Sequence, residues 1–222
     1  MKINKSTLDF LRELKTNNNR EWFLANKRSY ENARKEFESF IDQIIAGVVL
    51  FDDTLGHMAA RDCIFRIYRD VRFSHDKSPY KTHLGAFLSP ARKKTEIHSL
   101  AGYYIHIEPG GESMIAGGAY MPAGDWLRNI RKEIFYNGAE LRSIVNNKLF
   151  RQYFGEIEGE KLKKPPAGFP PDHPETELLK LKSFTVAHMC PDKLVLSDDF
   201  SGHCINALKI LHPFNRFFNE VA

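Results

Sequence analysis

The chain has 222 residues, of which 42% are hydrophobic and 27% are charged, a balance typical of a soluble globular protein whose core needs no disulfides. Its formal net charge of +4 is too small to mark a dedicated nucleic-acid-binding protein, and no apolar run approaches the roughly 20 residues of a membrane span. Three cysteines without a Cys-x-x-Cys motif, together with an amphipathic start in place of a hydrophobic signal, favour a cytoplasmic protein.

The first part of the chain, residues 1–56, is predicted to be helical. A first amphipathic helix is expected to begin near Ser6, where a capping-box-like pattern precedes regularly spaced leucines. Asn19 can cap a second helix. The 3.6-residue spacing of its apolar positions predicts one long helix from Arg20 to near Phe51.

Residues 57–121 are predicted to form a mainly antiparallel sheet, because short turns join segments of alternating polarity. Pro109, Gly110 and Gly111 form the clearest hairpin turn. Gly117 and Gly118 are expected to allow a bulge or close packing within a strand. The predicted strands are residues 63–73, 83–88, 99–108 and 112–120.

The second half of the chain returns to helices. Residues 122–154 are predicted to hold three of them, and the glycines and prolines of 155–174 predict an extended connector. Residues 175–222 read as a closing helix, strand and helix, in which Pro213 is expected to kink the last helix or divide it in two. This order predicts a single α+β domain over 1–222, with N-terminal, central and C-terminal helices packed on the sheet.

The stretch from residue 65 to residue 83 is the strongest candidate for a functional surface. From Arg61 to Lys81 the chain carries six basic and three acidic residues. Arginine suits carboxylate or phosphate groups through its planar fork of donors. A lattice of ion pairs that only supports the sheet is the alternative. With a period of two, the polar face of the first strand consists of Arg66, Tyr68, Asp70 and Arg72.

The third predicted strand places Tyr104, His106 and Glu108 on one face. If both polar faces line the same hollow, His106 is a candidate proton carrier with Tyr104 beside it, and Glu108 is expected to orient the imidazole and raise its pKa. A histidine satisfied within the sheet is the alternative. The candidate catalytic residues are thus His106 and Tyr104, and the candidate ligand-binding residues are Arg66, Tyr68, Arg72, Lys77, Lys81, His83 and Glu108.

Metal and cofactor motifs are absent from the sequence. His75, His83 and His106, with Asp76 or Glu108, are metal-ligand types, but no His-x-x-x-His or Cys-x-x-Cys spacing joins them. We therefore expect no metal site. The chain also has no Gly-rich phosphate-binding motif, so the sequence implies no cofactor.

Three functions are consistent with these residues. The first is an enzyme or binding protein for a small anionic ligand that bears a phosphate or a carboxylate. The second is a nucleic-acid-binding module that uses the same basic and aromatic residues together with Arg92, Lys93 and Lys94. The third is a protein–protein adaptor without chemistry.

Five strings of the sequence are distinctive when taken together: NREWF at 19–23, RDVRFS at 69–74, KSPYKTH at 77–83, HIEPGG at 106–111 and GGAYMP at 117–122. They resemble a widespread bacterial family known as domain of unknown function 2461. The resemblance covers nearly the full chain. It implies a single-domain bacterial protein, but it supplies no activity and gives no residue a catalytic role.

Overall fold

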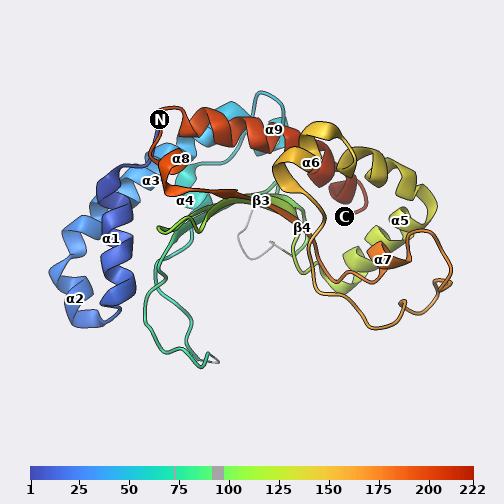
Figure 1. The fold of residues 1–222 in the computed structure, drawn as a ribbon, viewed down its shortest axis with the longest axis horizontal. Helices are drawn as coiled ribbons and strands as arrows, with labels where there is room; N and C mark the ends of the chain where they lie inside the picture. Colours follow the sequence, from blue (N-terminus) through green and yellow to red (C-terminus); the bar gives the residue numbers. More distant parts are fainter. Residues whose placement is uncertain (73, 92–97) are drawn as a thin grey trace. The chain divides into compact units, whose positions relative to one another are not determined.

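The structure is a computed structural model that describes residues 1–72, 74–91 and 98–222. Within these residues the fold is α+β, as predicted, with helices and a four-stranded antiparallel sheet in the order β1-β2-β3-β4 (Figure 1). The β2–β3 connection is the predicted hairpin, in which Gly110 and Gly111 have φ values of 93° and 80°. The strands are β1 Leu84–Leu88, β2 Gly102–Ile107, β3 Ser113–Ala119 and β4 Phe184–Cys190.

The chain divides into two compact units. β1 belongs to unit 1, whereas β2, β3 and β4 each contribute residues to both units. That the whole chain is one domain stays a prediction. Unit 1 consists of Met1–Leu88, Tyr104–Ile115 and Met189–Asn206, and unit 2 consists of Ser89–Tyr103, Ala116–His188 and Ala207–Ala222.

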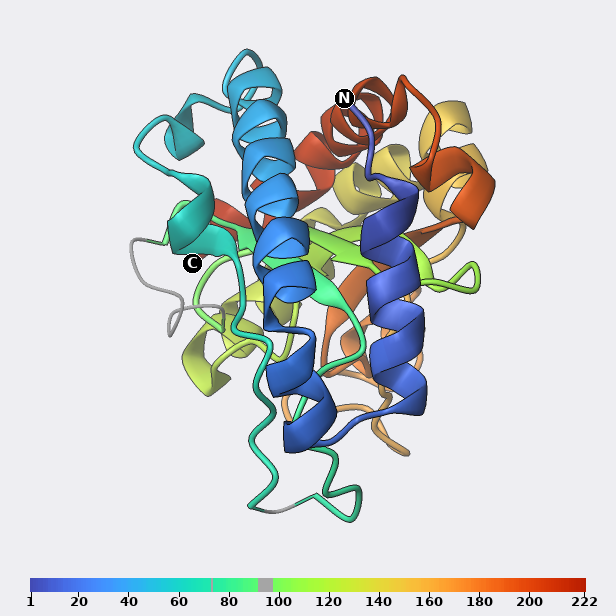
Figure 2. The same ribbon diagram turned by 90° about the vertical axis from the view of Figure 1, so that its left-hand side faces the viewer.

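The helices of unit 1 pack around the apolar face of a long helix, α3. The side chains of Phe37, Phe40 and Ile41 on this helix are fully buried, and the Phe40 ring stacks on Phe200 with centroids 5.4 Å apart. Figure 2 shows α1 lying alongside α3. The helical bounds are α1 Lys5–Thr16, α2 Arg20–Ala25, α3 Lys27–Val48, η1 Asp53–Leu55, α4 Ala60–Cys63, α8 Asp192–Val195 and α9 Phe200–Asn219, of which α9 continues into unit 2.

The prediction of one continuous helix from Arg20 to near Phe51 is wrong, because α2 ends at Ala25 and Asn26 separates it from α3. This residue leaves the helical conformation, with φ −105° and ψ 17°, and its side-chain amide donates to the Trp22 carbonyl at 2.9 Å. Such local side-chain bonds compete with helix continuation. The predicted cap at Asn19 is confirmed, since its side chain accepts from the Trp22 N–H at 2.9 Å.

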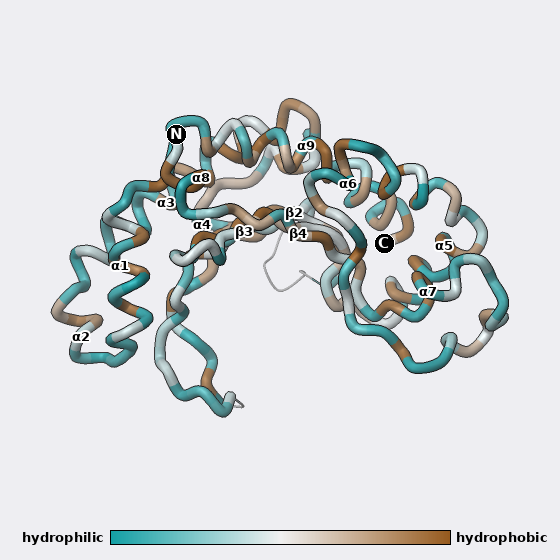
Figure 3. The backbone as a smooth tube through the Cα atoms, in the orientation of Figure 1, coloured by the Kyte–Doolittle hydropathy of each residue, from teal (hydrophilic) through white to brown (hydrophobic). Residues whose placement is uncertain are grey.

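The prediction of a strand over 63–73 is also wrong. Cys63 ends α4, Phe73 lies outside the described residues, and 64–72 make only the isolated antiparallel bridges Ile64↔Ala86 and Tyr68↔Tyr80. We call residues 64–83, apart from 73, the arm. It extends away from β1 as the teal loop of Figure 1 and is coloured mainly as hydrophilic in Figure 3.

Local side chains explain why the arm is not a regular ladder. The carboxylates of Asp70 and Asp76 accept from the backbone N–H groups of Arg72 and Ser78, and Pro79 has no N–H to donate. The period of two nevertheless persists in the burial pattern. Ile67 is buried, and the four residues of the predicted polar face are exposed, namely Arg66, Tyr68, Asp70 and Arg72.

The arm is fastened to the helices of unit 1 at Tyr80. The side-chain amide of Asn18 donates to the Tyr80 carbonyl at 2.9 Å and accepts from the Tyr80 N–H at 3.1 Å. The Phe23 ring of α2 stacks on the Tyr80 ring with centroids 4.0 Å apart, and the neighbouring Trp22 ring stacks on Phe10 at 6.0 Å. These contacts fix the position of the second half of the arm.

Unit 2 contains α5 Gly124–Val145, α6 Lys148–Phe154 and α7 Thr176–Leu179 together with the rest of α9. The predicted helix over 148–154 is confirmed. Gly138 was expected to end the first helix of this region, and the neighbouring Asn137 has non-helical angles within α5. Trp126 of α5 is buried, and its indole N–H donates to the Phe218 carbonyl at 3.1 Å. Among the described residues, no helix combines the length and apolar character needed to cross a membrane.

Two features of unit 2 bear on the sequence predictions. Pro213 was predicted to kink the last helix or divide it in two. The division does not occur, since α9 continues through Pro213, and buried packing at Phe214 and Phe218 offsets the lost backbone bond. The prediction of close packing at the strand glycines is confirmed. Gly118 has φ 115°, and a Cβ there would collide with the carbonyl oxygen of Phe184.

Candidate functional site

The unit 1 part of β2, together with Glu108 directly after it, carries a chain of hydrogen-bonded side chains on one face. The Tyr104 hydroxyl lies 2.9 Å from Nδ1 of His106, and Nε2 of His106 lies 3.0 Å from Oε2 of Glu108. The alternation of side chains along a strand turns all three residues to the same side. This part of the sequence-based geometry is confirmed.

His83, which directly precedes β1, joins this chain from the neighbouring strand. The two imidazole rings lie with centroids 4.1 Å apart, and Nδ1 of His83 is 3.8 Å from Oε2 of Glu108. We refer to His83, Tyr104, His106 and Glu108 as the histidine cluster. The side chains of His83, His106 and Glu108 are 25%, 8% and 15% exposed, so the cluster is shielded but open to solvent at His83.

The other oxygen of Glu108 is held by residues that sequence spacing did not reveal. Thr82 donates its hydroxyl to Oε1 at 2.9 Å, and the ammonium group of Lys15 on α1 lies 3.5 Å from the same oxygen. Thr82 neighbours His83 in the sequence, but no motif marked it. With both oxygens engaged, the carboxylate has a fixed orientation.

The backbone beneath Glu108 is also fixed. Its N–H donates to the Ser113 hydroxyl at 3.0 Å, and the same hydroxyl donates back to its carbonyl at 2.9 Å. In the turn that follows, the N–H groups of Gly110 and Gly111 point at the carboxylate of Asp192, 3.0 and 2.9 Å from Oδ1. Successive N–H groups that converge on an anion form a rigid turn, which locks the end of β2.

Burial decides the charge state of the imidazoles. It lowers the pKa of His83 to about 4, with repulsion from His106 as the next cause. Glu108 acts to raise the pKa of His106, as expected, but burial outweighs this effect and the pKa lies below its ordinary value. Both rings are therefore neutral at neutral pH.

Glu108 keeps its charge. Burial acts to raise the pKa of its carboxyl group, but hydrogen bonds from His106 and Thr82 outweigh this effect and bring the pKa below its ordinary value. A neutral His106 that donates from Nε2 to this carboxylate accepts at Nδ1 from the Tyr104 hydroxyl. The chain of donors thus runs from Tyr104 through His106 to Glu108.

Two cations of the arm differ from the rest. Lys81 is half-buried, with its ammonium group 5.1 Å from the centre of the Phe65 ring, and in the described part of the chain neither Lys81 nor Arg66 has a carboxylate within 4.0 Å. Burial lowers the pKa of Lys81, and repulsion by Arg66 lowers it further. Lys81 also lies near enough to His83 to lower its pKa.

The remaining predicted site residues lie elsewhere on the arm. Tyr68 is 53% exposed, with its ring 6.2 Å from that of Phe23 and 5.4 Å from that of Tyr80. The guanidinium of Arg72 is bound to Asp70 through contacts of 2.7 and 3.0 Å. Lys77 is exposed and donates to the Val71 carbonyl at 3.0 Å. Arg92, Lys93 and Lys94 lie outside the described residues. Among the described residues, no contact joins Tyr68, Arg72 or Lys77 to the histidine cluster.

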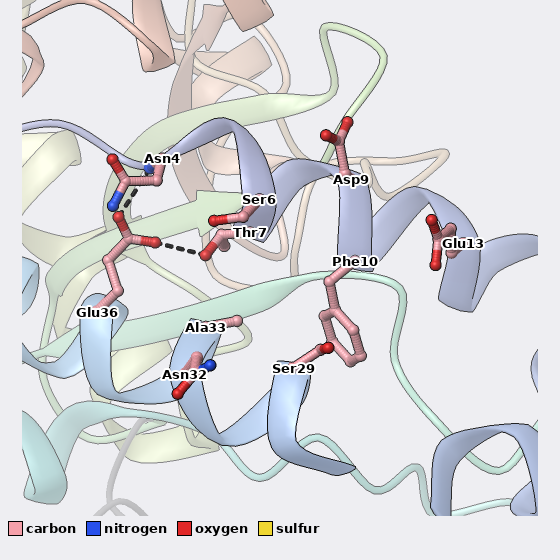
Figure 4. Close-up of a pocket in the computed structure, with 10 residues that line it drawn as sticks. All are labelled: Asn4, Ser6, Thr7, Asp9, Phe10, Glu13, Ser29, Asn32, Ala33 and Glu36. Carbon is pink, nitrogen blue, oxygen red and sulfur yellow. Dashed lines mark hydrogen bonds between the residues drawn. The ribbon is translucent and has the colours of Figure 1, made fainter. Parts of the chain in front are cut away.

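A separate pocket of about 370 Å³ lies between α1 and α3 (Figure 4). Its charged lining residues are Asp9, Glu13 and Glu36, and no lysine or arginine lines it, so it does not suit an anion. The carboxylate of Glu36 accepts from the Asn4 N–H at 2.8 Å and from the Thr7 hydroxyl. These bonds give Glu36 a structural role at the start of α1.

Comparison with known proteins gives one match. Neither the curated proteins nor the solved structures include a protein similar to this chain. The family model described as conserved hypothetical protein (DUF2461) matches residues 6–217, which is nearly the whole chain. The chain therefore belongs to the DUF2461 family of conserved hypothetical proteins.

Proposed function

We propose that unit 1 binds a small ligand bearing a carboxylate or a phosphate, with Lys81 and Arg66 holding the charged group beside the histidine cluster. The observation that carries this proposal is the half-buried ammonium group of Lys81, which has no carboxylate partner in the described part of the chain. Buried charges in proteins are normally paired.

The energetic argument concerns both cations. Lys81 loses part of its hydration on an apolar ring, and Arg66 repels it, so both effects oppose its charged form. An anion at this position relieves the repulsion and replaces lost hydration. Each charge-assisted contact of this kind contributes ~1.5–3 kcal/mol. Two contacts are sufficient for measurable affinity toward a small ligand.

The neighbouring imidazoles give such a site a way to handle protons. His106 accepts at Nδ1 from Tyr104 and donates from Nε2 to Glu108, so it can relay a proton from the phenol to the carboxylate, which leaves a phenolate and a neutral carboxyl group. Whether the protein is an enzyme depends on this step, and we propose His106 and Tyr104 as the groups that would carry it.

The test is a titration of the purified protein with inorganic phosphate and with small mono- and dicarboxylates, in buffer with a chelator, by calorimetry and thermal shift. We expect Lys81→Gln and Arg66→Ala to weaken the binding at least about tenfold with the fold retained. Lys35→Gln, which removes an exposed lysine from α3, is the matched control and should bind as the wild type does.

Two results would contradict the proposal. One is a wild-type protein to which none of these anions binds. The other is equal affinity in the wild type and both variants. Unfolding of Arg66→Ala would instead support a structural role for that arginine.

Nucleic-acid binding remains a second candidate on one observation. Arg66 and Tyr68 are both exposed on the arm, and a basic group and a stacking ring suit a single strand. Salt titration separates the two functions, because contacts with several phosphates give a steep decrease of affinity with salt, whereas a single small anion does not.

A further inference from the structure

We propose that His83, His106 and Glu108 bind a divalent transition-metal ion. One ring nitrogen from each histidine and one carboxylate oxygen lie within 4.8 Å of one another. This inference goes beyond the binding of an anion at Lys81 and Arg66, and it stands on a different observation. The three residues come from the adjoining ends of β1 and β2, so the scaffold beneath them is rigid.

The separations of the ligand atoms fit a metal ion. Metal–ligand bonds of 2.0–2.1 Å at tetrahedral angles place two ligand atoms about 3.4 Å apart. Oε2 of Glu108 lies 3.0 Å from Nε2 of His106 and 3.8 Å from Nδ1 of His83, on either side of this value. Changes of about 0.4 Å bring each of these two separations to the tetrahedral value.

The surroundings of the three ligands are those of a metal centre. The Tyr104 hydroxyl meets Nδ1 of His106, and Thr82 holds the second oxygen of Glu108. Partners of this kind fix the orientation of metal-binding side chains in metalloproteins. A metal ion at Nε2 would take the place of the proton there, which moves to Nδ1 and is donated to the Tyr104 oxygen, since a hydroxyl can accept as well as donate.

A purely structural role accounts for His106 but not for His83. His106 has a hydrogen-bond partner at each nitrogen. His83 is half-buried, and among the described residues neither of its nitrogens has a hydrogen-bond partner; Nδ1 is 3.8 Å from the nearest carboxylate oxygen, which is too far for one. A metal ion shared with Glu108 would satisfy this nitrogen.

The donor set selects the class of metal. Two imidazole nitrogens and one carboxylate oxygen suit Zn²⁺ and the neighbouring first-row ions, whereas Ca²⁺ and Mg²⁺ prefer oxygen ligands. Three protein ligands leave at least one coordination position open. Open positions are typical of metal sites that bind a ligand or activate water, not of closed structural sites.

The experiment titrates the metal-stripped full-length protein with Zn²⁺ in anion-free buffer, in competition with a chromogenic chelator. We expect one Zn²⁺ per chain and a loss of affinity of at least about 100-fold in His83→Ala and Glu108→Gln. Tyr104→Phe, which keeps all three ligands, should weaken Zn²⁺ roughly tenfold. His57→Ala removes an exposed histidine from unit 1 and is the matched control, with unchanged affinity expected.

Thermal melts in chelator check that each variant folds. If His83→Ala does not fold, Glu108→Gln, which keeps the contact with Thr82, still tests the proposed ligands. The visible spectrum of the Co²⁺ form of the wild type gives an independent measurement that needs no variant. Nitrogen and oxygen ligation gives weak d–d bands without the strong near-ultraviolet band of thiolate ligands.

A thiolate band, no Zn²⁺ binding by the wild type, or wild-type affinity in both ligand variants would overturn the proposal. Because the anion titrations are run in chelator and the Zn²⁺ titrations without anions, either proposal can fail without the other.

Discussion

The link between Asn18 and Tyr80 gives the sharpest test of how the arm is held. Asn18→Ala removes two hydrogen bonds, of 2.9 and 3.1 Å, and leaves the N–H and carbonyl of Tyr80 without these partners. Each such bond contributes about 1 kcal/mol net, so we expect a loss of about 2 kcal/mol in the free energy of unfolding. For a chain of this size that corresponds to a decrease in Tm of roughly 4–8 °C.

Urea denaturation followed by circular dichroism, together with a thermal melt, measures this loss directly. The matched control is Asn32→Ala on α3, where an exposed asparagine is replaced by a better helix former and stability should be unchanged or slightly higher. If Asn18→Ala changes the unfolding free energy by less than about 0.5 kcal/mol, the two-bond link does not hold the arm, and the reasoning from these contacts is wrong.

Two further predictions concern buried positions. Burial raises the pKa of the Cys190 thiol to about 12 and that of Cys204 well above its ordinary value, so at pH 8 both should react with iodoacetamide far more slowly in the folded protein than in urea; equal rates would contradict this. Gly118→Ala should destabilise the protein by about 3 kcal/mol or more in urea denaturation, because the added Cβ meets the Phe184 carbonyl and φ is positive. Gly124→Ala, where a Cβ would meet no atom within 4 Å, is its control and should be nearly neutral.

Local periodicity predicted the faces of the arm and of β2 but not the regularity of the arm. The alternation placed Ile67 inward and Arg66 outward, as observed, because side-chain direction in extended backbone depends only on the period of two. The continuous strand failed because Asp70, Asp76 and Pro79 divert or remove the backbone donors of a ladder. A side-chain amide at Asn26 interrupted the long helix in the same way.

The candidate site was predicted in part for a related reason. Tyr104, His106 and Glu108 share the predicted strand 99–108, so their spacing alone brought them together. His83 and Thr82 reach Glu108 only through the pairing of β1 with β2, and the register of that pairing is not encoded in the spacing of either strand. Lys15 comes from a helix that is remote in sequence, so no local pattern could have identified it.

The placement of the two tryptophans has a practical consequence. Trp22 belongs to unit 1, where it stacks on Phe10, and Trp126 is buried in unit 2. The chain contains only these two indoles, so Trp22→Phe and Trp126→Phe each leave one intrinsic fluorophore, in a known unit. Emission from each variant during denaturation then reports separately on the cooperativity of the half that retains its indole, without any external dye.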